Sequence, residues 1–503
     1  MLALVPRPAE LTRHSGFFAL HAGVRVVAGP GAGRAADLLT GFVGSGHGPE
    51  IRLGLRPGLG PEEYELDVTE DRVTLVATRE AGLFHGVQTL RQLGPDRWPC
   101  LRIRDWPRLA WRGVLLDVAR HFMPLDFLYE FTDLIALHKF TVLHLHLTDD
   151  QGWRMEVDGR PRLTEIGAWR TESMVGAAGS TVFDGVPHGG FYTRAELRGL
   201  VAHAAARGVR VVPEIDLPGH VRAALAAYPE LGNHPDRRLP VWTEWGISPD
   251  ILGMHDAALD FCRDVLTQTA GIFPSRHLHV GGDECPTTQW ETAPAARDRA
   301  RALGLRDTAG LHSWFLGELH GFLGELGRQA VCWDETGHSP GALPPGMTVA
   351  SWRDADHGAQ AVARGHQVIM APHTSTYFDY PQTDGPGEPP RELVTTLADV
   401  HAYDPLAGNL PAADPDDGGR PGVIGTQAQL WTEHAPTPDH VRQLAFPRLC
   451  ALAESAWSPG PRDYADFQAR LAGHLDLLRA LNALPKERVR FPGAVPVPGK
   501  PRT

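Results

Sequence analysis

Apolar and polar positions alternate in a regular rhythm from residue 111 onward. Eight short apolar runs have a β-type pattern, and helix-like segments separate most of them. The runs span residues 113–118, 141–147, 209–215, 277–280, 330–333, 348–352, 367–370 and 423–430. Helical spacing of apolar residues is clearest at 125–137, 194–206, 257–269 and 311–326. Strands that alternate with helices predict a parallel sheet, and eight strands are the number that closes a (β/α)8 barrel.

A different pattern precedes this rhythm. Residues 64–76 alternate apolar and polar side chains around a turn at Glu70-Asp71, which predicts a hairpin. Residues 81–93 then place apolar side chains at helical spacing, and Pro107 interrupts the chain soon afterwards. We therefore expect a small α+β domain before the barrel.

The pattern after the last run is less regular. The segment 382–421 is rich in Pro, Gly and Asp, which predicts a long loop with a short element near 393–400. Residues 471–481 predict a closing helix, and the Pro-rich end predicts an extended tail. The expected domains are 1–108 for the α+β unit, 109–485 for the TIM barrel and 486–503 for the tail.

Composition narrows the class of protein. Of the 503 residues, 42% are hydrophobic and 21% are charged, as in ordinary soluble proteins, and the net charge of -12 argues against nucleic acid or an anionic membrane as partner. The five cysteines form no C-x-x-C pair, so neither a disulfide framework nor a zinc ribbon is indicated. The sequence lacks a signal-peptide pattern and a membrane-length apolar run, which favours a cytoplasmic protein. No oligomeric state is indicated.

Polar side chains collect where the apolar runs stop. Carboxylates follow nearly all eight runs, and a tryptophan follows three of them. The residues are Asp117, Arg120, His121, Asp149, Asp150, Glu214, Asp216, His220, Asp283, Glu284, Trp333, Asp334, Glu335, Trp352, Arg353, Tyr377, Asp379, Trp431 and Glu433. Active sites of (β/α)8 barrels form at the C-terminal ends of the strands, so this distribution predicts a pocket. Sugars suit it, because their hydroxyls need paired hydrogen bonds and their C–H faces stack on aromatic rings.

The segment Gly281-Gly282-Asp283-Glu284 is the most specific of these strand ends. Neighbouring side chains of a strand point to opposite faces, so two adjacent acids serve one site only where the backbone bends. The two glycines permit such a bend and the close approach of a ligand. Crowded carboxylates at a strand end have pKa values that are pushed apart, which favours one ionised group and one proton donor.

Nine motifs occur in one order along the chain. They are DVARH at 117–121, HLHLTDDQGWR at 144–154, PEIDLPGH at 213–220, HVGGDE at 279–284, WDE at 333–335, SWR at 351–353, YFDY at 377–380, WTE at 431–433 and AESAW at 453–457. This set resembles the family 20 glycoside hydrolases, the β-N-acetylhexosaminidases. The first region is similar to the small domain that often precedes the barrel in that family, so the resemblance covers nearly the whole chain.

The resemblance implies a retaining mechanism in which the 2-acetamido oxygen of the substrate is the nucleophile and forms an oxazolinium intermediate, an exception to the two-carboxylate scheme. Glu284 would be the general acid and then the base, with a raised pKa suited to the first task. Asp283 would stay ionised, accept the acetamide N–H and stabilise positive charge, with Asp149 supporting it from behind. Tyr377 would hydrogen-bond the acetamide oxygen.

The resemblance also implies binding roles. Trp333, Trp352 and Trp431 would surround the acetamido methyl group and the sugar face. Arg120 would fork onto the hydroxyls of the non-reducing end, with Glu433 and Asp379 beside it. His220 and Glu214 would support the acid as a pair. The expected substrate is a terminal β-linked GlcNAc or GalNAc, with no metal or cofactor required. The sequence leaves open which sugar is preferred and whether it comes from chitin, peptidoglycan or a glycoconjugate.

Two other functions remain open at this stage. His144 and His146, with His220 or His279, have the spacing of metal ligands, which would suit a metal-dependent barrel hydrolase. A carbohydrate-binding barrel without catalysis is the third possibility, although it would have no need of both Asp283 and Glu284.

Smaller points bear on the edge of the site. Asp334-Glu335 is a second acidic pair, expected to act mainly as scaffold. Cys285 is expected to be a buried, inert thiol. Pro381 and Asp354 depart from the family pattern, which puts the aglycone preference in doubt.

Overall fold

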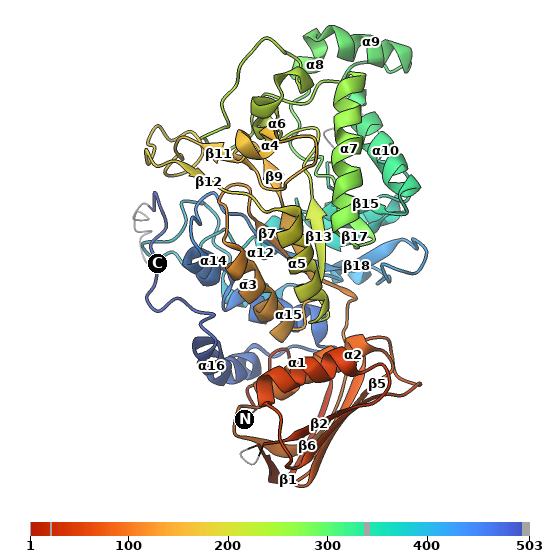
Figure 1. Cartoon of the computed structure of the whole chain (residues 1–503), viewed down its shortest axis with the longest axis vertical. Coiled ribbons are helices and arrows are strands. Elements are labelled where there is room, and N and C mark those ends of the chain that lie inside the picture. Colours follow the sequence, from red (N-terminus) through yellow and green to blue (C-terminus); the bar gives the residue numbers. More distant parts are fainter. Residues whose placement is uncertain (1, 21–22, 336–342, 495–503) are drawn as a thin grey trace.

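The computed structural model describes residues 2–20, 23–335 and 343–494. A six-stranded sheet domain lies at one end of the molecule and a closed eight-stranded barrel forms the rest (Figure 1). Both parts of the predicted fold class are confirmed. The part of the predicted tail from 495 lies outside the described residues.

Every apolar run of the sequence is a barrel strand. The strands are β7 (Trp111–Asp117), β8 (Val142–His146), β13 (Arg210–Glu214), β14 (His277–His279), β15 (Gln329–Trp333), β16 (Thr348–Ser351), β17 (Gln367–Met370) and β18 (Gly422–Leu430). Neighbours pair in parallel, and β18 closes the ring against β7. Strands buried on both faces need apolar side chains on both, which is why these runs are continuous rather than alternating.

Helices surround the barrel on its outside. The predicted helices are α3 (Leu125–Leu137), α5 (Arg194–Ala205), α7 (Asp256–Ile272) and α10 (Gly310–Glu325), and the others of six residues or more are α6 (Arg222–Ala227), α9 (Pro294–Ala302), α11 (Ala355–Ala363), α13 (Leu397–Ala402), α14 (Pro438–Ala445), α15 (Arg448–Trp457) and α16 (Tyr464–Ala480). The closing helix begins at Tyr464 rather than at 471, because the Asp463 carboxylate caps it by accepting from the N–H of Ala465 at 2.8 Å. No helix of the described chain is long and apolar enough to cross a membrane.

The loops at the C-terminal ends of the strands carry short elements of their own. These are β9 (Thr148–Asp149), β10 (Gly152–Trp153), α4 (Arg162–Glu165), β11 (Trp169–Arg170), β12 (His188–Gly189), η1 (Pro229–Leu231), α8 (Thr288–Thr292), α12 (His373–Thr376) and η2 (Ala407–Asn409). The short element predicted near 393–400 is α13, which starts later because Thr396 and Asp399 form a capping box.

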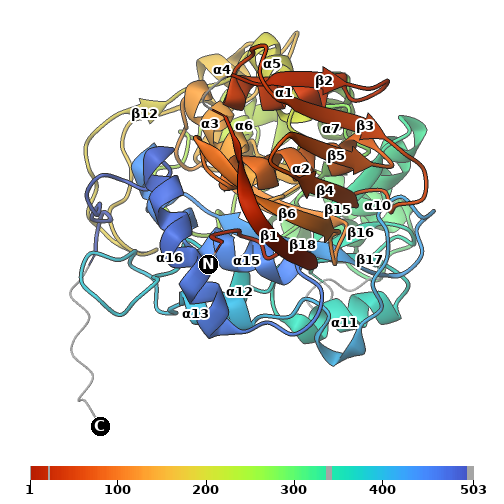
Figure 2. The same ribbon diagram turned by 90° about the horizontal axis from the view of Figure 1, so that it is seen from below.

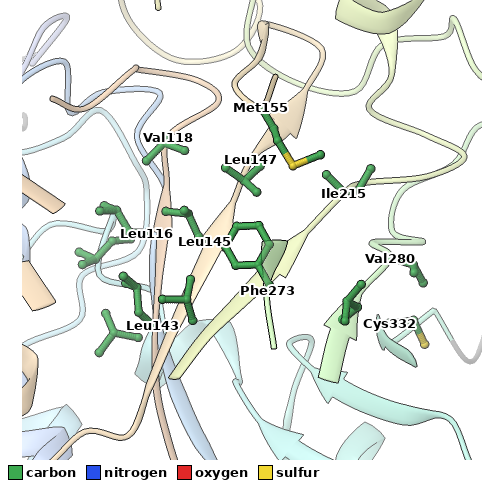
Figure 3. Packing of buried hydrophobic residues seen from close by; sticks show 14 of the residues in the cluster. Leu116, Val118, Leu143, Leu145, Leu147, Met155, Ile215, Phe273, Val280 and Cys332 are labelled. Carbon is green, nitrogen blue, oxygen red and sulfur yellow. The ribbon is translucent and has the colours of Figure 1, made fainter. Parts of the chain in front are cut away.

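The main core lies between the strands and the helices. Leu116, Leu143, Leu145 and Leu147 extend from β7, β8 and the turn that follows, and Phe273 packs beside them (Figure 3). The four leucines are fully buried, and each contributes about 1.5–3 kcal/mol relative to exposure. This packing holds the strand ends that build the site in fixed positions.

The N-terminal domain is one mixed sheet. Its elements are β1 (Glu10–Ala19), β2 (Arg25–Ala28), α1 (Gly33–Val43), β3 (Glu50–Leu55), β4 (Tyr64–Val68), β5 (Arg72–Ala77), α2 (Glu80–Gln92) and β6 (Arg97–Asp105). The strand order is β1-β6-β4-β5-β3-β2, seen side by side in Figure 2. β4 and β5 are the predicted hairpin, and α1 and α2 lie between the sheet and the barrel (Figure 1).

A buried ion pair joins the domain to the barrel. The Lys139 ammonium lies 2.6 Å from Asp105, and the same carboxylate accepts from Tyr64 at 2.8 Å and from the Trp457 indole at 2.9 Å. Lys139 and Asp105 are at most 1% exposed. Removing one partner of such a pair strongly destabilises the fold, because the other charge is left buried without a counter-charge.

Candidate active site

A cavity of about 340 Å³ opens at the C-terminal ends of the barrel strands. Nine of the eleven predicted site residues line it: Asp283, Glu284, Tyr377, Arg120, Trp333, Trp352, Asp379, Trp431 and Glu433. The other two, Asp149 and His220, are buried behind its wall. The volume is at the lower end of the ~300–1,000 Å³ typical of small-molecule sites.

The predicted backbone bend after β14 is present. Gly281 and Gly282 have φ values of +70° and +92°, and Glu284 itself is left-handed at +47°. A Cβ at position 281 would lie 1.7 Å from Oδ1 of Asp216. Glycine is therefore required there both by conformation and by the close approach of Asp216, a carboxylate to which the sequence analysis assigned no role.

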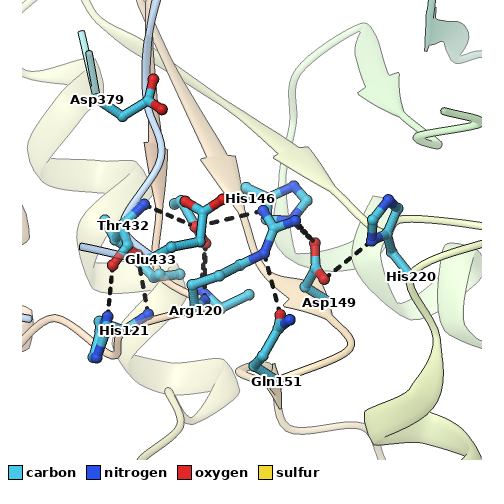
Figure 4. A network of polar contacts seen from close by, with 12 residues as sticks. Arg120, His121, His146, Asp149, Gln151, His220, Asp379, Thr432 and Glu433 are labelled. Atoms are coloured by element: carbon cyan, nitrogen blue, oxygen red, sulfur yellow. Dashed lines mark hydrogen bonds and ion pairs between the residues drawn. The ribbon is translucent and has the colours of Figure 1, made fainter. Parts of the chain in front are cut away.

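His220 connects the acidic pair to the residues behind it. Its Nδ1 lies 3.1 Å from Asp150 and 3.3 Å from Asp149, while its Nε2 lies 3.8 Å from Asp283 and 3.6 Å from Glu284. Burial alone would lower the pKa of His220, but Asp149 and Asp150 raise it well above its usual value, which favours the imidazolium form. Asp149 was expected to support Asp283 from behind. Its contacts run to Arg120, His146 and His220, so its link to Asp283 passes through His220 (Figure 4).

The pKa values of the acidic pair are opposite to those expected. Burial, with a smaller effect of the Glu284 charge, raises the pKa of Asp283 to about 7. Burial would also raise the pKa of Glu284, but the positive charge of His220, 3.6 Å away, outweighs it and lowers that pKa. The Glu284 side chain is 34% exposed and Asp283 only 16%, so solvent favours the ionised form of Glu284.

Aromatic rings form one side of the cavity. The rings of Trp333 and Trp431 are 5.9 Å apart between centroids, and Tyr377 lies 6.3 Å from both Trp431 and Trp352. Trp333 is fixed by donating its indole N–H to Glu214 at 2.7 Å. The tryptophans therefore line the cavity and pack the inner core at the same time.

Charged side chains also line the cavity. Arg120 lies 2.8 Å from Asp149 (Figure 4). Its guanidinium lies over the Trp431 ring at 5.0 Å. Arg391 pairs with Glu433 at 2.9 Å and with Asp379 at 3.2 Å. Burial, opposed by Arg391, raises the pKa of Asp379 to about 7, whereas Arg391 and Arg120 overcome burial and lower that of Glu433 to about 2.

Several buried polar atoms of this cavity have no hydrogen-bond partner among the described residues. They are Oδ1 of Asp283, Oδ1 of Asp379, Oε2 of Glu433, Nη1 of Arg120 and Nε1 of Trp352. Buried polar groups in folded proteins are almost always paired. Donors and acceptors left free around one cavity fit a ligand that offers several hydroxyl and amide groups.

The histidines of the metal hypothesis gather around Glu214. His279 lies 2.9 Å from this carboxylate, His146 2.5 Å and His144 3.1 Å. None of the three is among the residues lining the cavity. The carboxylate instead fixes Trp333 and the strand ends. The expected pairing of Glu214 with His220 is indirect, through His146 and Asp149.

The sequence analysis missed part of the cavity wall. Arg391, Trp245, Ile247, Ala178 and His434 line it without having been singled out. They lie in loops that have no periodic pattern. Only the position of Arg391 in the long segment 382–421, facing motifs rich in acids, could have drawn attention to it.

The remaining expectations concern the rim. Glu335 is ion-paired with Arg353 at 2.8 Å and lies 3.4 Å from the main-chain N–H of Glu284, which agrees with a scaffold position. Cys285 is half-buried rather than fully buried as expected, and desolvation raises the pKa of its thiol, in agreement with an inert cysteine. Asp354 caps α11 by accepting from the N–H of His357.

Fold and site together define a barrel hydrolase of sugars, and comparison with known families agrees. The chain belongs to glycosyl hydrolase family 20: the model of its catalytic domain matches residues 109–460, and the model of its domain 2 matches residues 1–106. The protein is therefore a glycoside hydrolase of the β-N-acetylhexosaminidase family.

Characterised relatives share much of the sequence. A β-hexosaminidase of Akkermansia muciniphila is 37% identical over 83% of this chain and 84% of its own. A β-N-acetylhexosaminidase of Cellulomonas fimi is 37% identical over 88% and 85%. A β-hexosaminidase of Porphyromonas gingivalis is also 37% identical over 85% of this chain, which spans only 55% of that relative.

Solved structures are similar over almost the full length. An exo-β-N-acetylglucosaminidase of Vibrio harveyi, in complex with N-acetylglucosamine, has a TM-score of 0.85 and 31% identity over 97% of this chain and 78% of its own. A β-hexosaminidase of Streptomyces plicatus has a TM-score of 0.80 and 32% identity over 96% of both chains.

Proposed function

We propose that this protein is an exo-acting, retaining β-N-acetylhexosaminidase that uses the acetamido group of its substrate as nucleophile. The observation that carries the proposal is that one cavity is lined by Asp283, Glu284 and Tyr377 together with the charged side chains of Arg120 and Glu433. These charged side chains suit the hydroxyls of a terminal sugar. The Vibrio harveyi relative, solved with N-acetylglucosamine, supports this class of ligand.

Each catalytic group has a defined task in this proposal. The Glu284 carboxyl gives its proton to the glycosidic oxygen as the bond from that oxygen to C1 breaks. The acetamido oxygen, oriented by a hydrogen bond from Tyr377, forms its bond to C1 from the opposite face. The Asp283 carboxylate accepts a hydrogen bond from the amide N–H. Water then attacks C1, Glu284 accepts a proton from it, and the acetamido group is restored. Two displacements at C1 retain the β configuration.

Substrate binding would raise the pKa of Glu284, so that it carries the proton that the first step needs. In the free protein the pKa of Asp283 is raised and that of Glu284 is lowered. An amide N–H that donates to Asp283 favours its ionised form and lowers its pKa. A sugar that covers the 34% exposed side chain of Glu284 removes water and raises the pKa of that group. Binding would thus bring the pair to the protonation states that the reaction requires.

Two experiments test this proposal: the stereochemistry of the released sugar and the effect of replacing the proposed general acid, Glu284. Proton NMR of a hydrolysis in progress should show the β-anomer of the free sugar first; an initial α-anomer would contradict retention. The variant Glu284→Gln should lose most of its turnover of substrates with poor leaving groups. Its turnover of substrates with activated aryl leaving groups should fall much less, since only poor leaving groups need a proton in the first step. The matched variant Glu335→Gln should lose far less, and equal losses on both substrate types would contradict the role of Glu284.

A further inference from the structure

Three buried side chains meet where helices α3, α15 and α16 pack together. His138 caps the C-terminus of α3, Cys450 lies in the first turn of α15 and His474 lies within α16. All three are at most 1% exposed, and none lines the active-site cavity. His138 Nε2 lies 2.9 Å from His474 Nε2 and 3.4 Å from Cys450 Sγ.

The other ring nitrogens face main-chain carbonyls. His138 Nδ1 lies 2.7 Å from the carbonyl oxygen of Leu134, and His474 Nδ1 lies 3.3 Å from that of Ala3. A carbonyl oxygen only accepts, so each Nδ1 is placed to donate. A neutral imidazole ring carries a single N–H. With one N–H each, both rings then present a bare Nε2 to the other.

No placement of the ring and thiol protons gives every polar atom of this cluster a hydrogen-bond partner. If the Cys450 thiol donates to His138 Nε2, the two Nε2 lone pairs oppose each other across 2.9 Å. If His474 Nε2 carries its proton and donates to His138, its Nδ1 becomes an acceptor facing the carbonyl of Ala3. Both arrangements leave two acceptors in contact at a buried site, where an unpaired polar group is costly.

We propose that His138, Cys450 and His474 bind a thiophilic metal ion, Zn²⁺ or Cu⁺, through both Nε2 atoms and Sγ. Donors at ~2.0–2.1 Å for nitrogen and ~2.3 Å for sulfur around one ion lie about 3–4 Å apart, close to the spacing observed. Thiolate with imidazole is a donor set that these soft ions prefer. Carbonyls that fix the far ring nitrogens are the usual partners of metal-ligating histidines.

Binding requires that the thiol lose its proton to solvent as the metal–sulfur bond forms. The Cys450 thiol is fully buried, which favours its neutral form in the absence of a cation. A bound cation reverses this preference and deprotonates the ligand. The ion would tie α16 and the N-terminal segment around Ala3 to the barrel, so the expected effect is on stability and not on turnover.

The experiment uses the full chain, purified without a histidine tag under reducing conditions. After chelation, the protein is titrated with Zn²⁺, with Cu⁺ or with Co²⁺ as a spectroscopic probe, and bound metal is counted by mass spectrometry. We expect one equivalent of Zn²⁺ or Cu⁺, a thiolate-to-Co²⁺ charge-transfer band, and a Tm several degrees higher than that of the metal-free protein, with kcat unchanged. The two titrations against competing chelators decide between Zn²⁺ and Cu⁺.

Cysteine variants locate the site. Cys450→Ala should lose the band, the bound equivalent and the metal-dependent rise in Tm. Cys262→Ala, an equally buried cysteine in α7, and Cys285→Ala, beside the catalytic acids, should retain all three. If Cys450→Ala does not fold, Cys450→Ser replaces it, and loss of the band is again expected. Absence of stoichiometric binding, or binding and a band unchanged in the Cys450 variants, would overturn the proposal.

Discussion

Arg391 is the cavity residue whose removal most sharply tests the proposed binding of the terminal sugar. It neutralises Glu433 and Asp379 at 2.9 and 3.2 Å, and the pKa of Asp379 is already about 7 with Arg391 present. In Arg391→Met we expect the pKa of both carboxylates to rise, and Asp379 to be protonated at neutral pH, because the neighbouring cation is lost. A charged hydrogen bond is worth ~1.5–3 kcal/mol and a neutral one about half as much.

Weakening two such bonds should cost ~1.5–3 kcal/mol, which corresponds to a ~10- to 150-fold loss in kcat/KM. The assay is kcat/KM for an aryl N-acetyl-β-glucosaminide between pH 5.5 and 8.5. The loss should be largest at low pH and should shrink as pH rises, because rising pH ionises the carboxylates again. The control is Arg353→Met, which breaks the ion pair with Glu335 at the rim and should stay within about fivefold. An equal loss in both variants, or a loss independent of pH, would refute this reasoning.

Three further outcomes are expected. Asp283→Asn should lower kcat, measured at saturating substrate, by ~100- to 1,000-fold, because the stabilisation of positive charge is lost. A raised KM with unchanged kcat would contradict this role. Gly281→Ala should lower the Tm and the activity together, because the new Cβ would lie 1.7 Å from a carboxylate oxygen of Asp216; an unchanged Tm measured by calorimetry would contradict the close approach. Lys139→Met should destabilise the protein by ~3–5 kcal/mol in denaturant unfolding by leaving Asp105 buried without its cation, and a change below ~1 kcal/mol would show that the pair is not needed.

The sequence predicted the barrel well because its physical signal is local. A strand buried on both faces must be apolar along its length, so each of the eight strands appears as one run. Positions just after these runs converge at one end of the barrel by topology alone, which is why Arg120, Trp352 and Glu433 could be placed in one site. The double glycine signalled the bend at Asp283 and Glu284 by the same local logic.

What could not be predicted depends on contacts between distant segments. Arg391 lies in a loop without periodicity, and only the folded chain brings it to Asp379 and Glu433. In the free protein the pKa shifts of Asp283 and Glu284 have the opposite direction to those expected, because they follow from the position of His220 and from unequal exposure, neither of which a motif records. His138, Cys450 and His474 come from three helices, and nothing in their local sequence links them.

Electron withdrawal at the acetamido group tests the central claim most directly. The measurement is kcat/KM for a series of aryl β-glucosaminides with one leaving group and zero to three fluorines on the acetyl methyl. If the acetamido oxygen attacks C1, each fluorine weakens the nucleophile, so kcat/KM should fall steeply along the series, and the matching β-glucoside without an acetamido group should be a very poor substrate. Rates that stay level across the series, or comparable turnover of the β-glucoside, would show that the nucleophile is not supplied by the substrate.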